Sequence, residues 1–260
     1  MRQEASVRRG LLMAACLLAL PARATEPAPP PLHIAAVQKD AVSWVAARLL
    51  TEVYRLAGLE LVVEPMPAPR AGLLALSGEV DGELIRTEAH GQRNPRLLRI
   101  DPPYYRIQVQ AFSLASRRVQ VGSRADLARY KLAAIRGLSY VPELTPGHPA
   151  LTLAQNSEQM FRMLQAERVD LALDSGLAAR HVLERLGLRE QLSASPELAR
   201  YELFHYLHPR HRALAPRIAA AIQRLKASGE LERLTEFYES MALTLSPERF
   251  DPGELAPRRP

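Results

Sequence analysis

Residues 73–81 read LLALSGEVD, and residues 157–170 read SEQMFRMLQAERVD. Both stretches place apolar residues at helical spacing, follow them with a turn, and end on Val-Asp at the start of a second apolar run. A helix that packs on a sheet and returns through a tight turn into the next strand has this pattern. Such a strand carries polar groups to its carboxyl end, where ligands of open α/β sheets bind. Asp81 and Asp170 themselves are interpreted as structural residues that cap or bond the adjacent loop.

Strand and helix patterns alternate on both sides of these two stretches. The first series predicts strands at 32–37, 59–63, 80–85 and 108–114, a helix that Asp40 or Ser43 caps and Gly58 ends, and a helix at 70–76. The second series predicts helices at 123–130, 157–167 and 176–186 and strands at 131–135 and 169–173, followed by a return strand at 201–207 and helices at 214–228 and 230–242. Strands that alternate with helices predict mainly parallel sheets covered on both faces.

The fold class predicted is therefore α/β, with two lobes that each contain a mainly parallel sheet flanked by helices, joined by a double-crossover hinge. Lobe one is predicted to comprise residues 32–114 and 201–245, and lobe two residues 115–200. The Pro-rich stretch 25–31 predicts an extended tether. Residues 246–260 combine proline and charge without an apolar period, which predicts a disordered tail.

The amino terminus has the pattern of an export signal. Arg2, Arg8 and Arg9 precede an apolar run at 11–20, and Ala22-Arg23-Ala24 supplies small residues at the cleavage spacing. We expect cleavage after Ala24 and a periplasmic mature protein. The run is too short for a spanning helix, which needs roughly 20 apolar residues. An uncleaved anchor and lipidation at Cys16 are the alternatives.

Composition excludes several classes of protein. Cys16 is the only cysteine among the 260 residues, so the predicted mature chain contains no disulfide and no thiolate site. Removal of residues 1–24 lowers the formal charge from +6 to +3, which is too small an excess to indicate a nucleic-acid partner. The sequence has no Gly-rich phosphate loop and no Gly-x-Ser-x-Gly nucleophile motif. We expect no cofactor, no metal and no catalytic residues, and we expect a monomer.

The order of elements resembles the family 3 extracellular solute-binding proteins, which are substrate-binding components of polar amino-acid ABC transporters. Three stretches carry the resemblance: 73–81, 157–170, and 219–234 with its KASGEL segment at 226–231. The resemblance implies the type II periplasmic binding protein fold. It also implies a small polar ligand, an amino acid or another small carboxylate, captured by hinge closure and delivered to an ABC permease in the inner membrane.

Two arginines follow the third predicted strand, and either could hold a carboxylate through the paired donors of its guanidinium. The family places its carboxylate-binding arginine twelve residues after the Val-Asp aspartate, which corresponds to Arg93, but His90 replaces the usual threonine three residues earlier. Arg86 lies closer to the end of the strand and is the first candidate. A solvated surface arginine is the alternative for each.

In the predicted lobe two, Gly137, Ser139 and Tyr140 resemble the Gly-x-Ser/Thr loop of the family, where backbone N–H groups bind an anion. An ordinary strand-to-helix turn is the alternative. The ammonium-binding aspartate of the family falls five residues after the second Val-Asp aspartate, where this chain has Ser175. Asp174 precedes it by one residue and is the candidate, with a helix N-cap as the alternative.

The first loop departs from the family pattern. Amino-acid-binding members stack an aromatic residue of this loop on the ligand, and here only Trp44 could do so. A core position for Trp44 is the alternative.

The sequence allows three other interpretations. His205, His208 and His211 are spaced three apart, which on an extended chain points them to opposite faces and disfavours a metal site. A periplasmic enzyme on this scaffold, such as a dehydratase or lyase, would need a general base with a raised pKa, for which Glu83 and Glu88 are the candidates. A sensor component without an importer is the remaining alternative.

Overall fold

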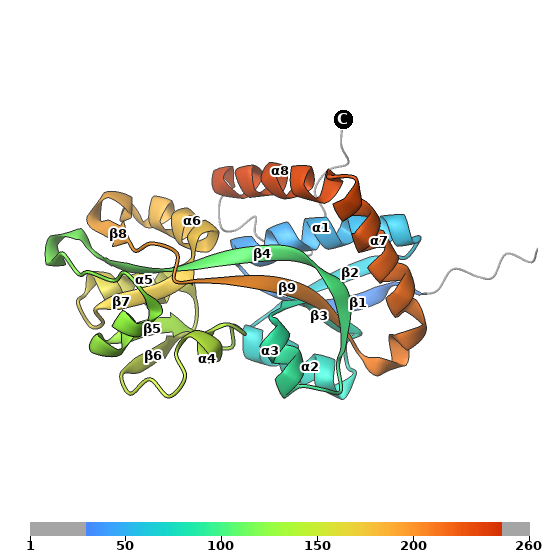
Figure 1. The fold of residues 1–260 in the computed structure, drawn as a ribbon, viewed down its shortest axis with the longest axis horizontal. Coiled ribbons are helices and arrows are strands. Elements are labelled where there is room, and N and C mark those ends of the chain that lie inside the picture. The colour runs from blue at the N-terminus through green and yellow to red at the C-terminus, as the bar shows by residue number, and fades with distance from the viewer. Residues whose placement is uncertain (1–29, 246–260) are drawn as a thin grey trace, which may run out of the picture.

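A computed structural model describes residues 30–245 (Figure 1). The signal peptide predicted at 1–24, with Cys16, and the tail predicted at 246–260 lie outside the described residues, as does most of the predicted tether. Between residues 30 and 245, no helix is both long and apolar enough to cross a membrane.

Within this range the strands form one nine-stranded sheet in the order β2-β1-β3-β9-β4-β7-β5-β6, with β8 paired to β4. In lobe one, β1 (Leu32–Val37) lies parallel to both β2 (Leu61–Met66) and β3 (Gly82–Arg86). In lobe two, β5 (Leu132–Ile135) lies parallel to both β6 (Leu151–Ala154) and β7 (Leu171–Ser175). Each lobe thus has a parallel sheet, as the alternation of strands and helices predicts.

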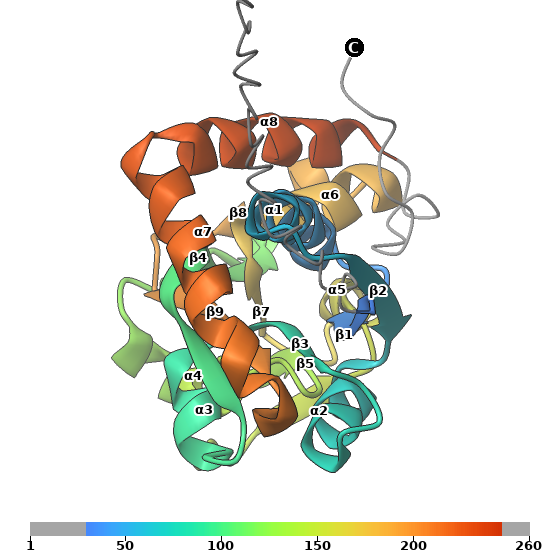
Figure 2. The same ribbon diagram turned by 90° about the vertical axis from the view of Figure 1, so that its right-hand side faces the viewer.

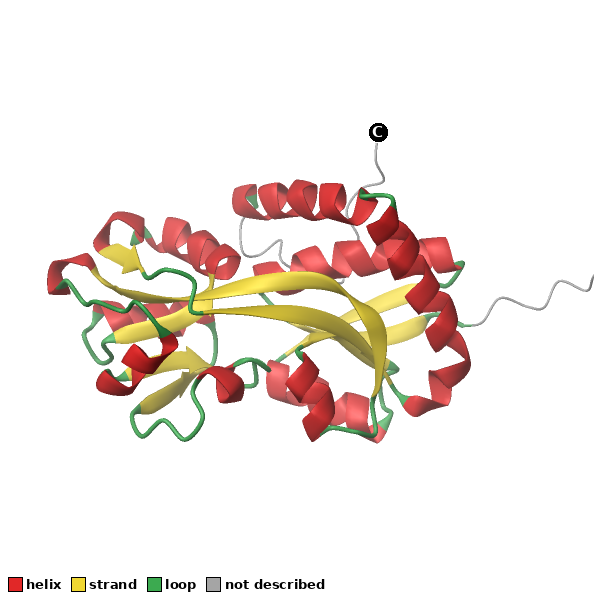
Figure 3. Cartoon of the chain, viewed as in Figure 1, coloured by secondary structure: helices red, strands yellow, loops and turns green. Residues whose placement is uncertain are grey.

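Two long strands connect the lobes. β4 (Leu98–Leu114) and β9 (Ala199–Leu207) are antiparallel partners that run side by side from one lobe into the other (Figure 3). β9 also pairs with β3, whereas the end of β4 pairs with β7 and β8 (Leu192–Ala194). These strands are the double crossover of the predicted fold class. The predicted residue boundaries of the lobes stay a proposal, because β4 contributes to both.

β4 begins ten residues earlier than the predicted strand at 108–114. Asp101-Pro102-Pro103 has the composition of a turn. For that reason the sequence does not predict that the strand begins before these residues. The pairing of β4 with β9 shifts register between Ile100 and Tyr105, which accommodates these residues without ending the strand.

Helices cover both faces of the lobe-one sheet. On one side lie α1 (Ala41–Ala57), α7 (Ala215–Ala227) and α8 (Glu230–Thr244), and on the other α2 (Ala68–Ser77) and α3 (Glu88–Arg93) (Figure 2). Lobe two contains α4 (Val141–Leu144), α5 (Ser157–Gln165) and α6 (Gly176–Leu186). Short 3₁₀ helices occupy Ala115–Arg117, Arg124–Arg129, Arg189–Gln191 and Pro209–Leu214. The helix predicted at 123–130 is therefore a 3₁₀ segment.

Local sequence explains the limits of α1. The Asp40 side chain accepts a hydrogen bond from the Ser43 backbone N–H at 2.8 Å, which caps the first turn. Gly58 has a φ of 63°, the left-handed conformation that ends helices, and the Leu59 N–H returns to the Tyr54 carbonyl. Because Leu59 belongs to this cap, β2 begins two residues later than the predicted strand at 59–63.

The two Val-Asp patterns have equivalent structural roles. Asp81 accepts a hydrogen bond from the His33 N–H at 2.7 Å, and Asp170 accepts one from the Lys131 N–H at 2.8 Å. Each carboxylate therefore fixes the start of the neighbouring parallel strand in its own lobe. The structural interpretation of both aspartates is confirmed.

Capping of α5 supports a modest stability prediction. The Asn156 side chain accepts a hydrogen bond from the Gln159 N–H at 2.9 Å. Asn156→Ala is expected to lower the free energy of unfolding by about 1 kcal/mol, because a backbone donor of the first turn loses its partner. Asn156→Asp retains an acceptor and should unfold close to the wild type in urea. Equal losses in both variants would contradict this role for the cap.

Candidate functional site

A cavity of about 40 Å³ lies between the two lobes. Its walls come from the ends of β1, β3 and β7, the start of α1, the loop after β5, and the middle of β4 and β9. The lining residues are Val37, Asp40, Val42, Ser43, Ile85, Arg86, Ile107, Leu138, Ser139, Tyr140, Asp174, Ser175 and Leu203. The carboxyl ends of parallel strands converge on it, which is the usual position of ligand sites in open α/β sheets.

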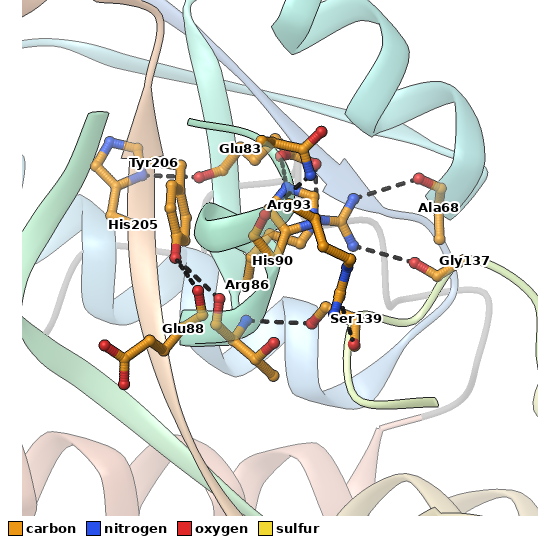
Figure 4. Close-up of polar contacts among 12 residues, drawn as sticks. Ala68, Glu83, Arg86, Glu88, His90, Arg93, Gly137, Ser139, His205 and Tyr206 are labelled. Carbon is orange, nitrogen blue, oxygen red and sulfur yellow. Dashed lines mark hydrogen bonds and ion pairs between the residues drawn. The ribbon is translucent and has the colours of Figure 1, made fainter. Parts of the chain in front are cut away.

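Arg86 lines this cavity, but most of its donors are already used (Figure 4). Its Nε donates to the Glu83 carboxylate at 2.6 Å, and its Nη2 donates to the Ala68 carbonyl at 3.2 Å. Its Nη1 donates across the cleft to the Gly137 carbonyl at 3.5 Å. Arg86 is 4 % exposed and Glu83 is 1 % exposed, so this is a buried ion pair. Arg86 therefore connects the lobes, and its positive charge is compensated within the protein.

Glu83 does not have the properties of a general base. Burial alone raises the pKa of its carboxyl, but Arg86 and the His90 ring, whose Nε2 lies 2.7 Å from Oε2, outweigh that effect and lower the pKa to about 2. A base for proton abstraction near neutral pH needs a raised pKa. Glu88 is paired with Arg99 outside the cavity. Neither glutamate fits the enzyme alternative.

Arg93 lies outside the cavity lining. It belongs to α3, a helix that the sequence analysis missed, and its Nη2 donates to the Ser139 carbonyl of lobe two at 3.2 Å. The Arg93 side chain is 44 % exposed and has a distant ion pair with Glu143 at 4.0 Å. Its guanidinium therefore remains accessible at the edge of the cleft.

The two lobes also contact each other through Thr87. Its backbone N–H donates to the Ser139 hydroxyl at 3.1 Å, and its own hydroxyl donates to Glu143. Gly137 lies against Pro69 of lobe one and has a φ of 84°. The predicted loop at 137–140 therefore meets lobe one directly.

Tyr140 is 4 % exposed and lines the cavity. Its ring stacks on Tyr201 of β9, with ring centroids 5.7 Å apart, and its hydroxyl has no hydrogen-bond partner among the described residues. Burial, followed by the charges of Asp174 and Asp40, raises the pKa of Tyr140 well above its usual value. Tyr140, Asp174 and Asp40 all line the same cavity.

Asp174 is buried at the end of β7, and its carboxylate accepts hydrogen bonds from the Ser157 hydroxyl at 2.9 Å and the Ser175 N–H at 2.8 Å. Burial is the main cause that raises its pKa to about 7, and the negative charge of Asp40 adds to it. The N-cap alternative does not hold for Asp174, because Ser175 caps α6 by accepting from the Ala178 N–H.

From the sequence, Asp40 is predicted only as a helix cap. Its carboxyl also faces the cavity, and burial raises its pKa despite the opposing hydrogen bonds from Ser43. No feature of the sequence distinguishes this cap from an ordinary one.

Trp44 occupies the alternative core position. It is 2 % exposed, does not line the cavity, and makes an edge contact with Tyr238 of α8 at 6.1 Å between ring centroids. Trp44 is the fourth residue of α1, and its side chain packs between helices.

The three histidines do not converge. His205 is fully buried, with Nε2 3.0 Å from the Tyr54 hydroxyl and Nδ1 2.9 Å from the Glu83 carbonyl, and burial lowers its pKa to about 4. His211 instead pairs with Asp81 at 2.5 Å. Among the described residues, no three His, Cys, Asp or Glu side chains gather as a metal site would require.

No family model matches the chain. An uncharacterized protein of Shewanella oneidensis is 26% identical over 194 residues, which cover 72% of this chain and 73% of that protein.

Solved structures show a closer likeness in fold. An amino acid ABC transporter substrate-binding protein of Streptococcus pneumoniae, bound to L-arginine, superposes with a TM-score of 0.67 at 18% identity over 82% of this chain and 96% of that one. The ligand-binding core of GluR0 with L-glutamate has a TM-score of 0.70 at 14% identity over 82% and 99%. A histidine kinase sensor domain similar to periplasmic binding proteins has a TM-score of 0.67 at 16% identity over 80% and 95%. The chain therefore has the fold of the type II periplasmic binding proteins.

Proposed function

We propose that the protein is a divergent family 3 solute-binding protein that captures a small polar ligand between its two lobes and catalyses no reaction. The observation that carries the proposal is the convergence of polar side chains from both lobes on one cavity, with Arg86 and Asp40 on one side and Ser139, Tyr140 and Asp174 on the other. A ligand that bonds to both sides favours the closed arrangement, because it interacts better with that state than with an open one.

Ligand entry requires the lobes to separate. Ligand pockets commonly measure about 300–1,000 Å³, whereas this cavity holds about 40 Å³. The Thr87–Ser139 hydrogen bond also joins the two lobes at Ser139, one of the lining residues. β4 and β9 are the continuous connections between the lobes in the described structure, so bending of these strands is the proposed hinge motion.

A ligand with both an acidic and an amino group fits the distribution of charge. Arg93 at the edge of the cleft has an accessible guanidinium, and Gly137 and Ser139 bring backbone and hydroxyl groups beside it. These groups are the proposed carboxylate contacts, together with the guanidinium N–H groups of Arg86 that face no protein acceptor. Asp174 is the proposed ammonium contact.

The proposed location is the periplasm, after cleavage of the signal at 1–24, and the proposed partner is an ABC permease. The likeness to a histidine kinase sensor domain favours a sensor role as the second candidate. Genes for a permease and an ATPase beside the gene of this protein would support import. A neighbouring kinase gene without them would support the sensor role.

Native mass spectrometry tests the proposal, using protein purified from the periplasm without denaturation. We expect one small solute to remain bound, and NMR spectra of that solute should show signals that shift on addition of protein without converting to product. Conversion of the solute would support the enzyme alternative. Protein that carries no solute, and that shifts no signal in a broad pool of small metabolites, would contradict the proposed function.

Gly137→Ala tests the closure directly. A Cβ at this position would lie 2.8 Å from the Pro69 Cδ and 2.9 Å from the Pro69 backbone N, both in the opposite lobe. The overlap exists only when the lobes are closed, so it should shift the equilibrium towards the open form by roughly 10- to 100-fold. Small-angle scattering should report a larger radius of gyration than for the wild type.

Gly147→Ala is the matched control for this variant. Gly147 has a φ of 62°, similar in sign to that of Gly137, but no atom lies within 4 Å of the added Cβ. Gly147→Ala therefore places a non-glycine residue in the left-handed conformation, as Gly137→Ala does, but it creates no overlap with the opposite lobe. Identical scattering of the two variants would contradict the closed contact.

A further inference from the structure

We propose that Asp40 is a second ligand-binding carboxylate, which with Asp174 and the Tyr140 hydroxyl of the opposite lobe surrounds an ammonium group of the ligand. The inference rests on the proposed function. It adds that the part of the ligand bound in this cavity is positively charged. Asp40 and Asp174 approach the cavity from different lobes, so a cation between them is held only when the lobes are closed.

The position of Asp40 is fixed by its role as a cap. One carboxylate oxygen accepts from the Ser43 N–H at 2.8 Å, which holds the side chain at the start of α1. A carboxylate has about four acceptor sites, so this bond, together with the contacts from the Ser43 side chain and the Val42 backbone, still leaves capacity for a ligand. The residue remains partly accessible, whereas its carboxyl lies deep enough for burial to raise its pKa.

Asp40, Asp174 and Tyr140 all line the same cavity of about 40 Å³. The charge of Asp40 raises the pKa of Asp174 across the cavity, and both carboxylates raise the pKa of Tyr140. Arg86 is the cationic residue of the lining, and Glu83 already compensates its charge at 2.6 Å. The cavity therefore holds two acidic groups and no uncompensated cation in its lining, which favours a positively charged guest.

The other elements that pack against Asp174 supply no countercharge at this site. Ser157 of α5 donates a neutral hydrogen bond, and Gln110 of β4 stands opposite Asp174 in the strand register. The first turn of α6 contains no basic residue, and its basic and imidazole side chains, Arg180 and His181, begin one turn later. A cation from the ligand would thus be the nearest compensating charge.

The Tyr140 hydroxyl is independent evidence for a ligand. A buried hydroxyl without a partner costs about 1–3 kcal/mol, and Tyr140 is held in place by its stack on Tyr201. An ammonium group can donate to the phenolic oxygen and, with its other N–H groups, to the two carboxylates. The cost is removed when such a group binds.

The size of the cavity agrees with a single ammonium group. A cavity needs a volume of about 10–15 Å³ to hold one water molecule. The closed cavity has about 40 Å³, so it admits an ammonium or methylammonium ion without further opening of the lobes. Methylammonium chloride is therefore a suitable probe, and methanol is a neutral probe of similar size.

The test compares the wild type with Asp40→Asn and Glu190→Gln. Asparagine caps helices about as well as aspartate, so Asp40→Asn removes the charge while it retains the acceptor for the Ser43 N–H. Glu190 is exposed and is not one of the lining residues, so Glu190→Gln controls for the loss of one negative charge. Urea unfolding before probes are added should be cooperative in all three proteins. Asp40→Asn should be at least as stable as the wild type, because it removes a charge that burial disfavours.

Binding is followed by the fluorescence of Trp44, the only tryptophan, which is four residues from Asp40. We expect methylammonium to give a saturable change in the wild type and in Glu190→Gln, an apparent dissociation constant at least tenfold higher in Asp40→Asn, and no saturable change with methanol. A wild type that ignores methylammonium, or an Asp40→Asn variant that binds it equally well, would overturn the inference. The proposed function would stand in either case if native mass spectrometry finds a bound solute.

Discussion

Replacement of Glu83 with alanine is expected to lower the free energy of unfolding by about 3–5 kcal/mol, the usual cost of removing one partner of a buried ion pair. Arg86 would keep its charge in a site where it is 4 % exposed and its compensating carboxylate is gone. His90 would lose its partner at 2.7 Å as well. Urea denaturation measures the loss, provided that the slope of the transition stays that of the wild type.

A double variant separates the charge effect from the effect of lost packing. In Glu83→Leu with Arg86→Met, no unpaired charge remains, and apolar replacement of both partners of a buried pair is often neutral. We expect the double variant to recover roughly half or more of the stability lost in Glu83→Ala. A double variant that is less stable than Glu83→Ala would show that the hydrogen bonds from Arg86 to Ala68 and Gly137 matter more than the ion pair.

Asp174→Asn should stabilise the protein by an amount that grows with pH. Asp174 has a pKa near 3.8 in the unfolded chain and of about 7 in the folded protein, because burial disfavours its charged form. Between these values the folded protein holds a proton that the unfolded chain has released. The stabilisation from this proton is therefore fully present below the pKa of the unfolded chain, and it is lost as the pH rises through the pKa of about 7 in the folded protein.

The asparagine variant resembles the protonated aspartate at every pH. It can accept from the Ser175 N–H and donate to the Ser157 hydroxyl, as the neutral carboxyl would. Relative to the wild type, its free energy of unfolding should rise by about 1 kcal/mol per pH unit between pH 4 and pH 7 and level off above that range. A difference that is constant with pH would contradict the raised pKa of Asp174.

Long elements with a clear apolar period could be predicted from the sequence. β1 and α6 begin and end where the pattern places them, at 32–37 and 176–186. Short elements were missed because they offer too few residues for a period. α3 reads EAHGQR, which contains no large apolar residue, and β6 has four residues. Tertiary contacts, not local pattern, define such elements.

The candidate site was predictable in position but not in detail. Its location follows from strand ends, and Gly137, Ser139, Tyr140 and Asp174 do face lobe one or the cavity between the lobes. The pairing of Glu83 with Arg86 was not predictable. Residues three apart on a regular strand point to opposite faces, but the β3 register shifts between these two positions and brings them together.

The central claim is that two lobes close on a small solute that carries an amino group. Small-angle scattering of ligand-stripped wild type, recorded while amino acids and small organic amines are added one at a time, tests it most directly. The account predicts that at least one of these solutes lowers the radius of gyration saturably in the wild type and in Gly147→Ala, and that Gly137→Ala stays open with the same solute. Profiles that remain unchanged in the wild type across the whole panel would contradict it.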